Sequence, residues 1–225
     1  MEDPAFSFSA KGRLTDYDLR RFPTDSLFDR LARAVCHAGC LPRKELYEAW
    51  EMARRVRRVF RGGRIVDLAA GHGLLAHVLL ILDNSSPRGL VVDTAPPPST
   101  GKLHQELVSA WPRLDGRIVF ARQPLDSVPI VGDDLVVSAH ACGALTDLVL
   151  ERAAAARARV AVLPCCHDLE VNDAGPLAGW MDGPLAVDAM RAVRLERRGY
   201  RVRTQMIPRA ITPKNRLLLG MPTGD

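Results

Sequence analysis

The sequence lacks long hydrophobic runs and an N-terminal targeting signal. None of its 225 residues belongs to a stretch apolar enough to span a membrane, and Met1-Glu2-Asp3-Pro4 does not have the charged and apolar regions of a signal peptide. It has only five cysteines, two of them adjacent, which does not indicate a disulfide framework. No internal repeat is visible. We therefore expect a protein of the reducing cytoplasm.

Lysine is also scarce, so arginine carries most of the positive charge. The net charge is +5, and the four lysines are Lys11, Lys44, Lys102 and Lys214. Arginines are concentrated in residues 54–61 and 191–203. Such clusters can form an electrostatic footprint for RNA or another polyanion, or they can simply be the solvated faces of helices. Both interpretations stay open at this point.

Apolar segments of strand length alternate with helical segments from Arg64 onward. The expected strands cover residues 64–70, 89–93, 117–120, 135–139, 159–163, 200–207 and 216–221. Helical segments separate the earlier strands, which predicts an α/β fold with a doubly wound, mostly parallel, seven-stranded sheet. The last two strands are joined by residues 208–215 alone, which is too short for a crossover helix and predicts an antiparallel hairpin at the C-terminus.

Residues 1–61 are predicted to be an N-terminal tail and helical cap, and residues 62–225 the main domain. Thr24-Asp25-Ser26 can cap a helix that ends near Gly39, and Pro42 suits the first turn of a second helix that runs to about Phe60. These helices precede the first strand, so we expect them to cover the mouth of the site or one edge of the sheet. The second one carries residues that could reach a ligand, namely Arg43, Lys44, Glu45 and Trp50.

The first strand leads into a glycine turn and a helix. Residues 71–76 fit the dinucleotide pattern G-x-G-x-x-A, in which Gly71 and Gly73 allow a ligand to approach the backbone closely. However, Asp67 stands four residues before Gly71, where a carboxylate repels a pyrophosphate but can hold an ammonium group. Asp93 ends the next strand and can bind ribose hydroxyls. This D-x-x-x-G-x-G pattern resembles motif I of the class I S-adenosylmethionine (SAM)-dependent methyltransferases, a Rossmann-like fold.

The ends of later strands supply further candidates. Gln123 and Leu125 follow the third strand and are candidates for the adenine pocket. His140 and Cys142 follow the fourth strand, and Cys165-Cys166-His167 follows the fifth. Neighbouring parallel strands end at the same edge of a sheet, so these side chains should share one crevice. The SAM methyl group is expected near the fourth strand, which also makes His140 a cofactor-binding candidate.

Three kinds of chemistry could use this group of side chains. A histidine can serve as a general base for an oxygen or nitrogen nucleophile. A cysteine can attack a pyrimidine ring before methylation at carbon. The histidines and cysteines together could bind zinc, although the spacing alone assigns no metal ligand. The alternative is that the cysteines fill space and the histidines bond to backbone groups.

Two of these segments carry a more specific resemblance. His140-Ala141-Cys142-Gly143 and Pro164-Cys165-Cys166-His167 resemble the motifs of a methyltransferase-domain family marked by His-x-Cys-Gly and Pro-Cys-Cys-His. That family includes the eukaryotic enzyme that methylates a ribose 2′-hydroxyl of tRNA. The resemblance implies SAM binding by Asp67, Gly71, Gly73 and Asp93. It also implies a substrate pocket built from His140, Cys142, Cys165, Cys166 and His167.

The predicted function is SAM-dependent methyl transfer to an oxygen or nitrogen nucleophile. The candidate catalytic residues are His140, His167, Cys165 and Cys166. RNA is the leading acceptor class, from the resemblance and the arginine clusters. The alternatives are a small-molecule or protein methyltransferase, an NAD-dependent oxidoreductase and a non-catalytic SAM-binding protein. The sequence does not indicate an oligomeric state.

Overall fold

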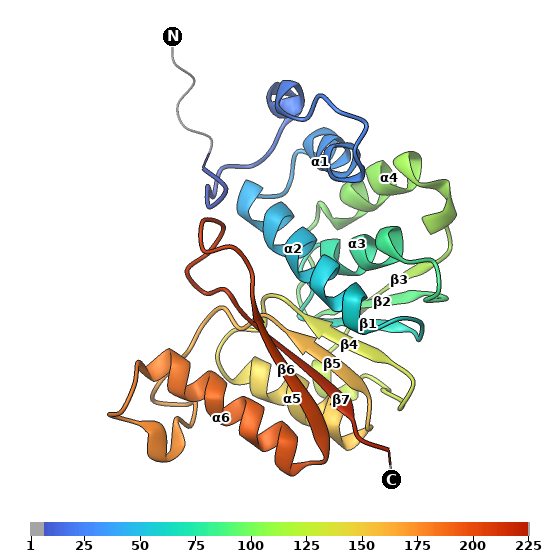
Figure 1. Cartoon of the computed structure of the whole chain (residues 1–225). Coiled ribbons are helices and arrows are strands. Elements are labelled where there is room, and N and C mark those ends of the chain that lie inside the picture. Colours follow the sequence, from blue (N-terminus) through green and yellow to red (C-terminus); the bar gives the residue numbers. More distant parts are fainter. Residues whose placement is uncertain (1–6, 225) are drawn as a thin grey trace.

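The computed structural model describes residues 7–224 and contains the predicted seven-stranded sheet (Figure 1). The strand order is β3-β2-β1-β4-β5-β7-β6. The strands are β1 (Ile65–Leu68), β2 (Gly89–Asp93), β3 (Ile118–Arg122), β4 (Leu135–Ser138), β5 (Arg159–Val162), β6 (Tyr200–Met206) and β7 (Arg216–Pro222). Strands β1 to β5 pair in parallel, whereas β7 runs antiparallel to both β5 and β6. The predicted fold class, including its C-terminal hairpin, is confirmed.

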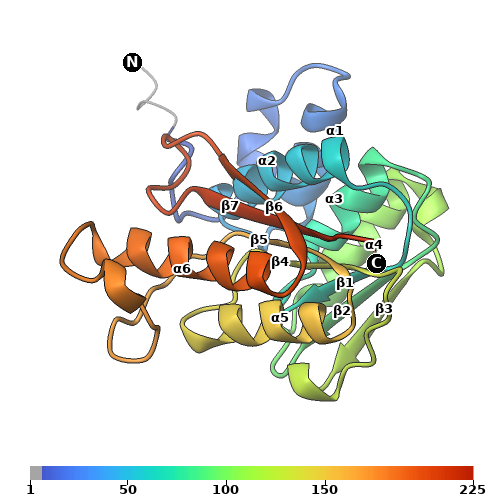
Figure 2. The same ribbon diagram turned by 60° about the horizontal axis from the view of Figure 1, so that its bottom comes forward.

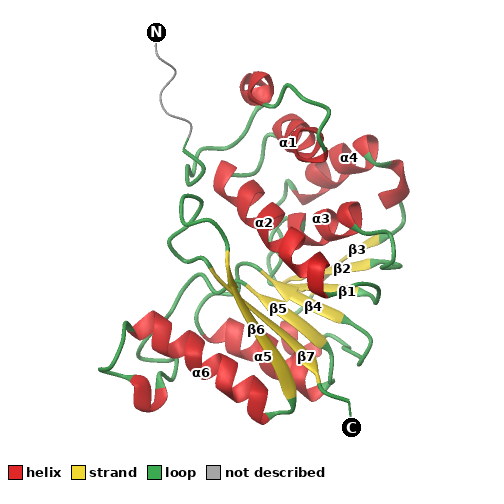
Figure 3. Cartoon of the chain, viewed as in Figure 1, coloured by secondary structure: helices red, strands yellow, loops and turns green. Residues whose placement is uncertain are grey.

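Helices cover both faces of this sheet, as Figure 3 shows. The helices are α1 (Leu27–Ala38), α2 (Arg43–Val59), α3 (Leu74–Leu82), α4 (Thr100–Ala110), α5 (Ala144–Ala155) and α6 (Gly183–Arg197). Successive residues of a strand point to opposite faces, so each strand contributes to two cores. In β4, for example, Val137 packs in the core shared with α1 to α4, while Val136 packs in the core shared with α5 and α6.

The N-terminal helices begin and end where the sequence predicts. The Ser26 side chain accepts a hydrogen bond from the Asp29 N–H (3.1 Å), and Gly39 ends α1 in the left-handed conformation. Helix α1 lies against α4, and α2 lies against α3. Of the predicted tail, residues 1–6 lie outside the described part. Leu14 and Phe22 are buried in the core to which α1 and α2 also contribute. The helical cap therefore shares a core with the sheet, and a domain boundary near residue 61 stays a prediction.

Helices α5 and α6 lie side by side on the opposite face of the sheet (Figure 2), and ion pairs join them. The Arg191 side chain is 1% exposed; its guanidinium donates to both oxygens of Asp147 (2.9 Å each) and to Asp188 (3.1 Å). The Arg194 guanidinium pairs with Asp173. Two of the six arginines at 191–203 are therefore neutralised by carboxylates within the fold.

Strand β1 lies between β2 and β4, so the chain continues in opposite directions on its two sides. This is the position where doubly wound sheets leave a crevice at the carboxyl ends of their strands. Within residues 7–224, no helix is long and apolar enough to cross a membrane.

Candidate active site

The turn after β1 is sharply curved by residues with positive φ. The φ angles of Ala69, Gly71 and Gly73 are 52°, 53° and 74°. A Cβ atom on Gly73 would lie 2.7 Å from Val91 Cγ1, so glycine is required there for α3 to pack on β2. A Cβ atom on Gly71 would meet nothing within 4 Å. Gly71 therefore leaves its backbone open to a ligand, whereas Gly73 serves packing. The left-handed alanine at position 69 is a strained feature that the sequence did not indicate.

Asp67 lies beneath this turn with little compensation for its charge. Its carboxyl group is 2% exposed and accepts one hydrogen bond, from the Ala76 N–H at 3.1 Å. Burial raises the pKa of Asp67 to about 8, an effect that the Ala76 hydrogen bond opposes and the nearby Asp93 carboxylate strengthens. A cation placed beside this carboxyl group would favour its ionised form.

Asp93 joins the end of β2 to the glycine turn. Its carboxylate accepts hydrogen bonds from the Gly71 N–H (2.8 Å) and from the Ala95 N–H (2.9 Å). These bonds fix the orientation of the carboxylate at the carboxyl edge of the sheet, and the residue is only half-buried. The side chain is therefore held where it can also accept bonds from a ligand.

A narrow cleft runs between this turn, β4 and the start of α2. Its volume is about 20 Å³, so a nucleoside-sized ligand needs neighbouring side chains to move. His72 extends from the glycine turn and its Nε2 lies 2.8 Å from Ser99 Oγ. The lining residues are Glu45, Ala49, Asp67, Ala69, Ala70, His72, Leu74, Leu75, Ala139 and His140. Glu45 thus reaches the cleft as the sequence suggested, whereas His72 was not anticipated.

The two adenine-pocket candidates lie after β3. Leu125 is 6% exposed and packs with Val66, Val92 and other residues of the core beside α5. Gln123 is half-buried beside it in the chain. Neither residue lines the narrow cleft described above. Their assignment to an adenine pocket stays a prediction.

The ends of β4 and β5 bring three cysteines together. Ser138 and Val162 are partners in the β4–β5 register, so the loops that follow them emerge side by side. The sulfur atoms of Cys142 and Cys165 are 3.2 Å apart, and those of Cys165 and Cys166 are 3.8 Å apart. All three sulfur atoms lie within 4.8 Å of one another. We call Cys142, Cys165 and Cys166 the thiol cluster.

His140 connects the cleft with this thiol cluster. It lines the cleft and stands two residues before Cys142. The residue is partly open to solvent, but the atoms packed around its ring displace water, and this desolvation and the nearby Lys44 ammonium group both lower its pKa. A lowered pKa favours a neutral imidazole that can accept a proton. Lys44 Nζ in turn lies 3.4 Å from Glu48 Oε1. A lysine therefore approaches the site from α2.

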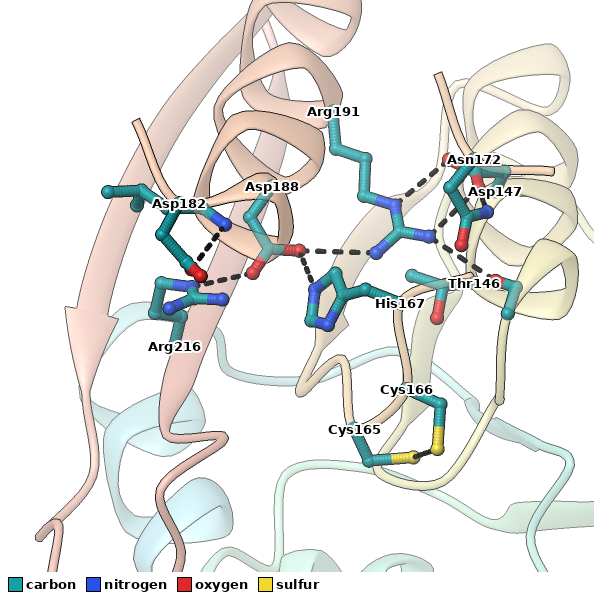
Figure 4. Close-up of polar contacts among 12 residues, drawn as sticks. Thr146, Asp147, Cys165, Cys166, His167, Asn172, Asp182, Asp188, Arg191 and Arg216 are labelled. Carbon is teal, nitrogen blue, oxygen red and sulfur yellow. Dashed lines mark hydrogen bonds and ion pairs between the residues drawn. The ribbon is translucent and has the colours of Figure 1, made fainter. Parts of the chain in front are cut away.

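His167 lies in the protein interior beside the thiol cluster (Figure 4). Its side chain is 1% exposed, and its Nε2–H donates to Asp188 Oδ1 at 2.8 Å. Asp188 also accepts from Arg216 Nε at 2.6 Å and from Arg191. The other ring nitrogen, Nδ1, is buried without a hydrogen-bond partner among the described residues. His167 therefore fixes the turn after Cys166 and does not line the cleft, and a catalytic role for it stays a prediction.

The fold resembles that of solved class I methyltransferases. An O-methyltransferase family protein from Burkholderia thailandensis superposes with a TM-score of 0.52 at 19% identity over 92% of this chain and 64% of that one. A putative O-methyltransferase from Nostoc punctiforme gives 0.53 at 14% identity, over 85% and 59% of the two chains. Mitomycin 7-O-methyltransferase MmcR gives 0.52 at 17% identity, over 93% and 64%. The chain thus spans about 60% of the length of these neighbours.

No protein-family model and no curated protein sequence matches the chain. The structural neighbours share too few identical residues to transfer an activity, so they establish a class I methyltransferase fold and nothing finer.

Proposed function

We propose that the chain is a SAM-dependent methyltransferase whose cofactor binds in the cleft over the carboxyl ends of β1, β2 and β4. The observation that carries this proposal is the buried Asp67 carboxyl group beside the open glycine turn. The methionyl ammonium group of SAM would supply the cation that Asp67 lacks. Asp93 would accept hydrogen bonds from the ribose hydroxyls, and the Gly71 backbone would face the cofactor.

An NAD-dependent oxidoreductase fits this arrangement less well. A dinucleotide places a pyrophosphate over the glycine turn, where the buried Asp67 would repel it once ionised. The antiparallel β6–β7 hairpin also matches the methyltransferase variant of the doubly wound sheet. These two features are independent of each other, because one concerns the site and the other concerns the far edge of the sheet.

His140 is the proposed general base. Methyl transfer proceeds by in-line attack, so holding the acceptor in line with the S–CH₃ bond supplies much of the rate. An O–H or N–H acceptor must also lose a proton, and a neutral imidazole at the cleft can take it. Cys165 and Cys166 lie on the same side as His140, but their covalent attack on a pyrimidine is a less direct proposal, because burial raises the pKa of the Cys165 thiol.

RNA remains the proposed acceptor class. However, fewer arginines are available to bind a polyanion than the sequence contains, because some are paired within the fold. Arg57 is buried and bound to Leu79 O, Ser86 and Asp83, and Arg54 pairs with Glu51. In contrast, Arg58, Arg201 and Arg203 line one groove of about 150 Å³ between α2 and the β6–β7 hairpin. This three-arginine groove is the part of the surface that we propose contacts an RNA backbone.

Calorimetric titration tests the cofactor. We expect SAM and S-adenosylhomocysteine to bind with micromolar dissociation constants, which correspond to about −8 kcal/mol, and NAD to bind far more weakly. Tight binding of NAD with no binding of SAM to the folded protein would contradict the proposal.

Transfer of a labelled methyl group tests the acceptor. Total RNA, protein and small-molecule extracts from a host that lacks the gene are incubated with the protein and labelled SAM. We expect label in RNA, with an affinity that falls steeply as salt concentration rises. Replacing Arg58, Arg201 and Arg203 by glutamine should weaken RNA binding, whereas Arg54→Gln, at an arginine already paired with Glu51, should change it little. Label confined to small molecules or proteins would replace RNA by that acceptor class.

A further inference from the structure

The three sulfur atoms of the thiol cluster are spaced like the ligands of one metal ion. Thiolates bound tetrahedrally to Zn²⁺ at 2.3 Å lie about 3.8 Å from each other. The Cys165–Cys166 separation is 3.8 Å, the Cys142–Cys165 separation is 3.2 Å, and the third pair lies within 4.8 Å. Side-chain rotations that move the sulfur atoms by at most about 1 Å would therefore place all three on one ion.

The backbone explains why two adjacent cysteines can face the same ion. In an extended strand, successive side chains point to opposite faces. Strand β5 ends at Val162, and Cys165 and Cys166 lie in the irregular segment that follows. Their side chains consequently turn to the same side, where they meet Cys142 from the loop after β4.

Positive charge lies near the cluster, because the Lys214 and Lys44 ammonium groups act electrostatically on Cys166. Three neighbouring thiolates repel one another, so a divalent cation is the partner that would allow all of them to ionise.

Hydrogen bonds of the neighbouring His167 hold the turn that carries Cys165 and Cys166. His167 follows Cys166, and its Nε2–H donates to Asp188, which two arginines also hold. Figure 4 shows the ring between Asp188 and the Cys165–Cys166 pair, with Nδ1 on the side away from Asp188. This network fixes the residue that follows Cys166, so the turn that carries two of the ligands is ordered before an ion binds.

We propose that Cys142, Cys165 and Cys166 bind one Zn²⁺ ion as thiolates, with a fourth coordination position open to solvent beside the cofactor cleft. Soft thiolate ligands favour zinc over magnesium, calcium or manganese. Each cysteine releases its proton to solvent when the ion binds. An open fourth position is a feature of zinc sites that bind water or a substrate. His140 lies between the cluster and the cleft. An ion at the cluster would therefore be placed to bind the nucleophilic atom of the acceptor.

Metal analysis of the untagged, reduced protein tests this site. After incubation with Zn²⁺ and removal of unbound ions, we expect one zinc per chain. Substitution with Co²⁺ should give the intense visible absorption of a tetrahedral ion and the near-ultraviolet charge-transfer bands of bound thiolates. Cys142→Ala and Cys166→Ala should each weaken zinc binding by on the order of 100-fold or more. Cys36→Ala is the matched control, because Cys36 is buried in α1 away from the cluster.

The outcomes are distinct. Stoichiometric zinc that is lost in the two cluster variants and kept in Cys36→Ala supports the site. No zinc in the folded, reduced wild-type protein overturns it, as does a Co²⁺ spectrum without thiolate bands. Formation of a Cys142–Cys165 disulfide in a protein that takes up no zinc after reduction would also overturn it, since the cluster would then be a redox pair. A protein that binds zinc but not SAM would retain this inference and lose the proposed function.

Discussion

Binding of SAM should release protons and depend on pH through Asp67. A carboxyl group with a pKa of about 8 is about one-tenth ionised at pH 7 and about half ionised at pH 8. The proposed complex requires the ionised form, because the ligand's ammonium group is its partner. The α-amino group of SAM has an ordinary pKa of about 8 and must remain protonated.

These two ionisations set the magnitude of the effect. From pH 6 to pH 7 the ionised fraction of Asp67 rises faster than the ammonium fraction falls, so the affinity should increase about eightfold. It should pass through a maximum near pH 8 and decrease above it, where the ligand loses its charge. At pH 7, Asp67 loses about 0.9 proton and the amine gains about 0.1, so binding should release about 0.8 proton per SAM.

Calorimetry in buffers of different ionisation enthalpy measures this proton release directly. Asp67→Asn is the matched variant, because the amide oxygen can still accept the Ala76 hydrogen bond without carrying a charge. We expect it to bind SAM weakly and without proton release.

The ligand-free Asp67→Asn variant should nevertheless be more stable than the wild-type protein at pH 8. The raised pKa of Asp67 means that the folded state retains a proton that the unfolded state loses between about pH 4 and pH 8, so wild-type stability falls as the pH rises through that window. Binding of SAM to the wild-type protein without proton release would exclude Asp67 as the group that ionises.

Three further predictions follow from the same contacts. Gly71→Ala should weaken SAM binding, whereas the control Gly116→Ala should not. Both glycines have positive φ and open surroundings, so each variant should lose about 1 kcal/mol of unfolding free energy, measured with urea. His140→Gln should reduce kcat by on the order of 100-fold with little effect on SAM affinity, and should remove the acidic limb of the kcat profile against pH; an unchanged profile would exclude His140 as the base. Asp188→Asn should destabilise the fold by about 3 kcal/mol in thermal or urea unfolding, because it leaves His167, Arg191 and Arg216 without their shared carboxylate.

The fold could be predicted because the relevant signals are local. Strand length, the glycine turn and the short connection at 208–215 determine the sheet and its final hairpin, and the observed strand ends differ from the expected ones by only one or two residues. The meeting of Cys142 with Cys165 and Cys166 also followed from the expected adjacency of β4 and β5, which the pairing confirms.

The sequence indicated that α2 could reach a ligand, but not which of its residues would. Packing of α2 against α3 brings Glu45 to the cleft and Lys44 near His140, whereas Arg43 and Trp50 do not line the cleft. Likewise, the arginine clusters are visible as charge, but the pairing of Arg57 with Asp83 depends on the tertiary fold. Charge counted along a sequence therefore overstates the charge available to a polyanion.

If SAM binds in the cleft beneath the glycine turn, a crystal structure of the complex with S-adenosylhomocysteine will show the ligand there. We expect the ligand's ammonium group to lie within hydrogen-bonding distance of Asp67. Its ribose hydroxyls should contact Asp93, and its sulfur atom should face His140. A ligand bound elsewhere on the chain, or one whose ammonium group is remote from Asp67, would contradict this placement of SAM.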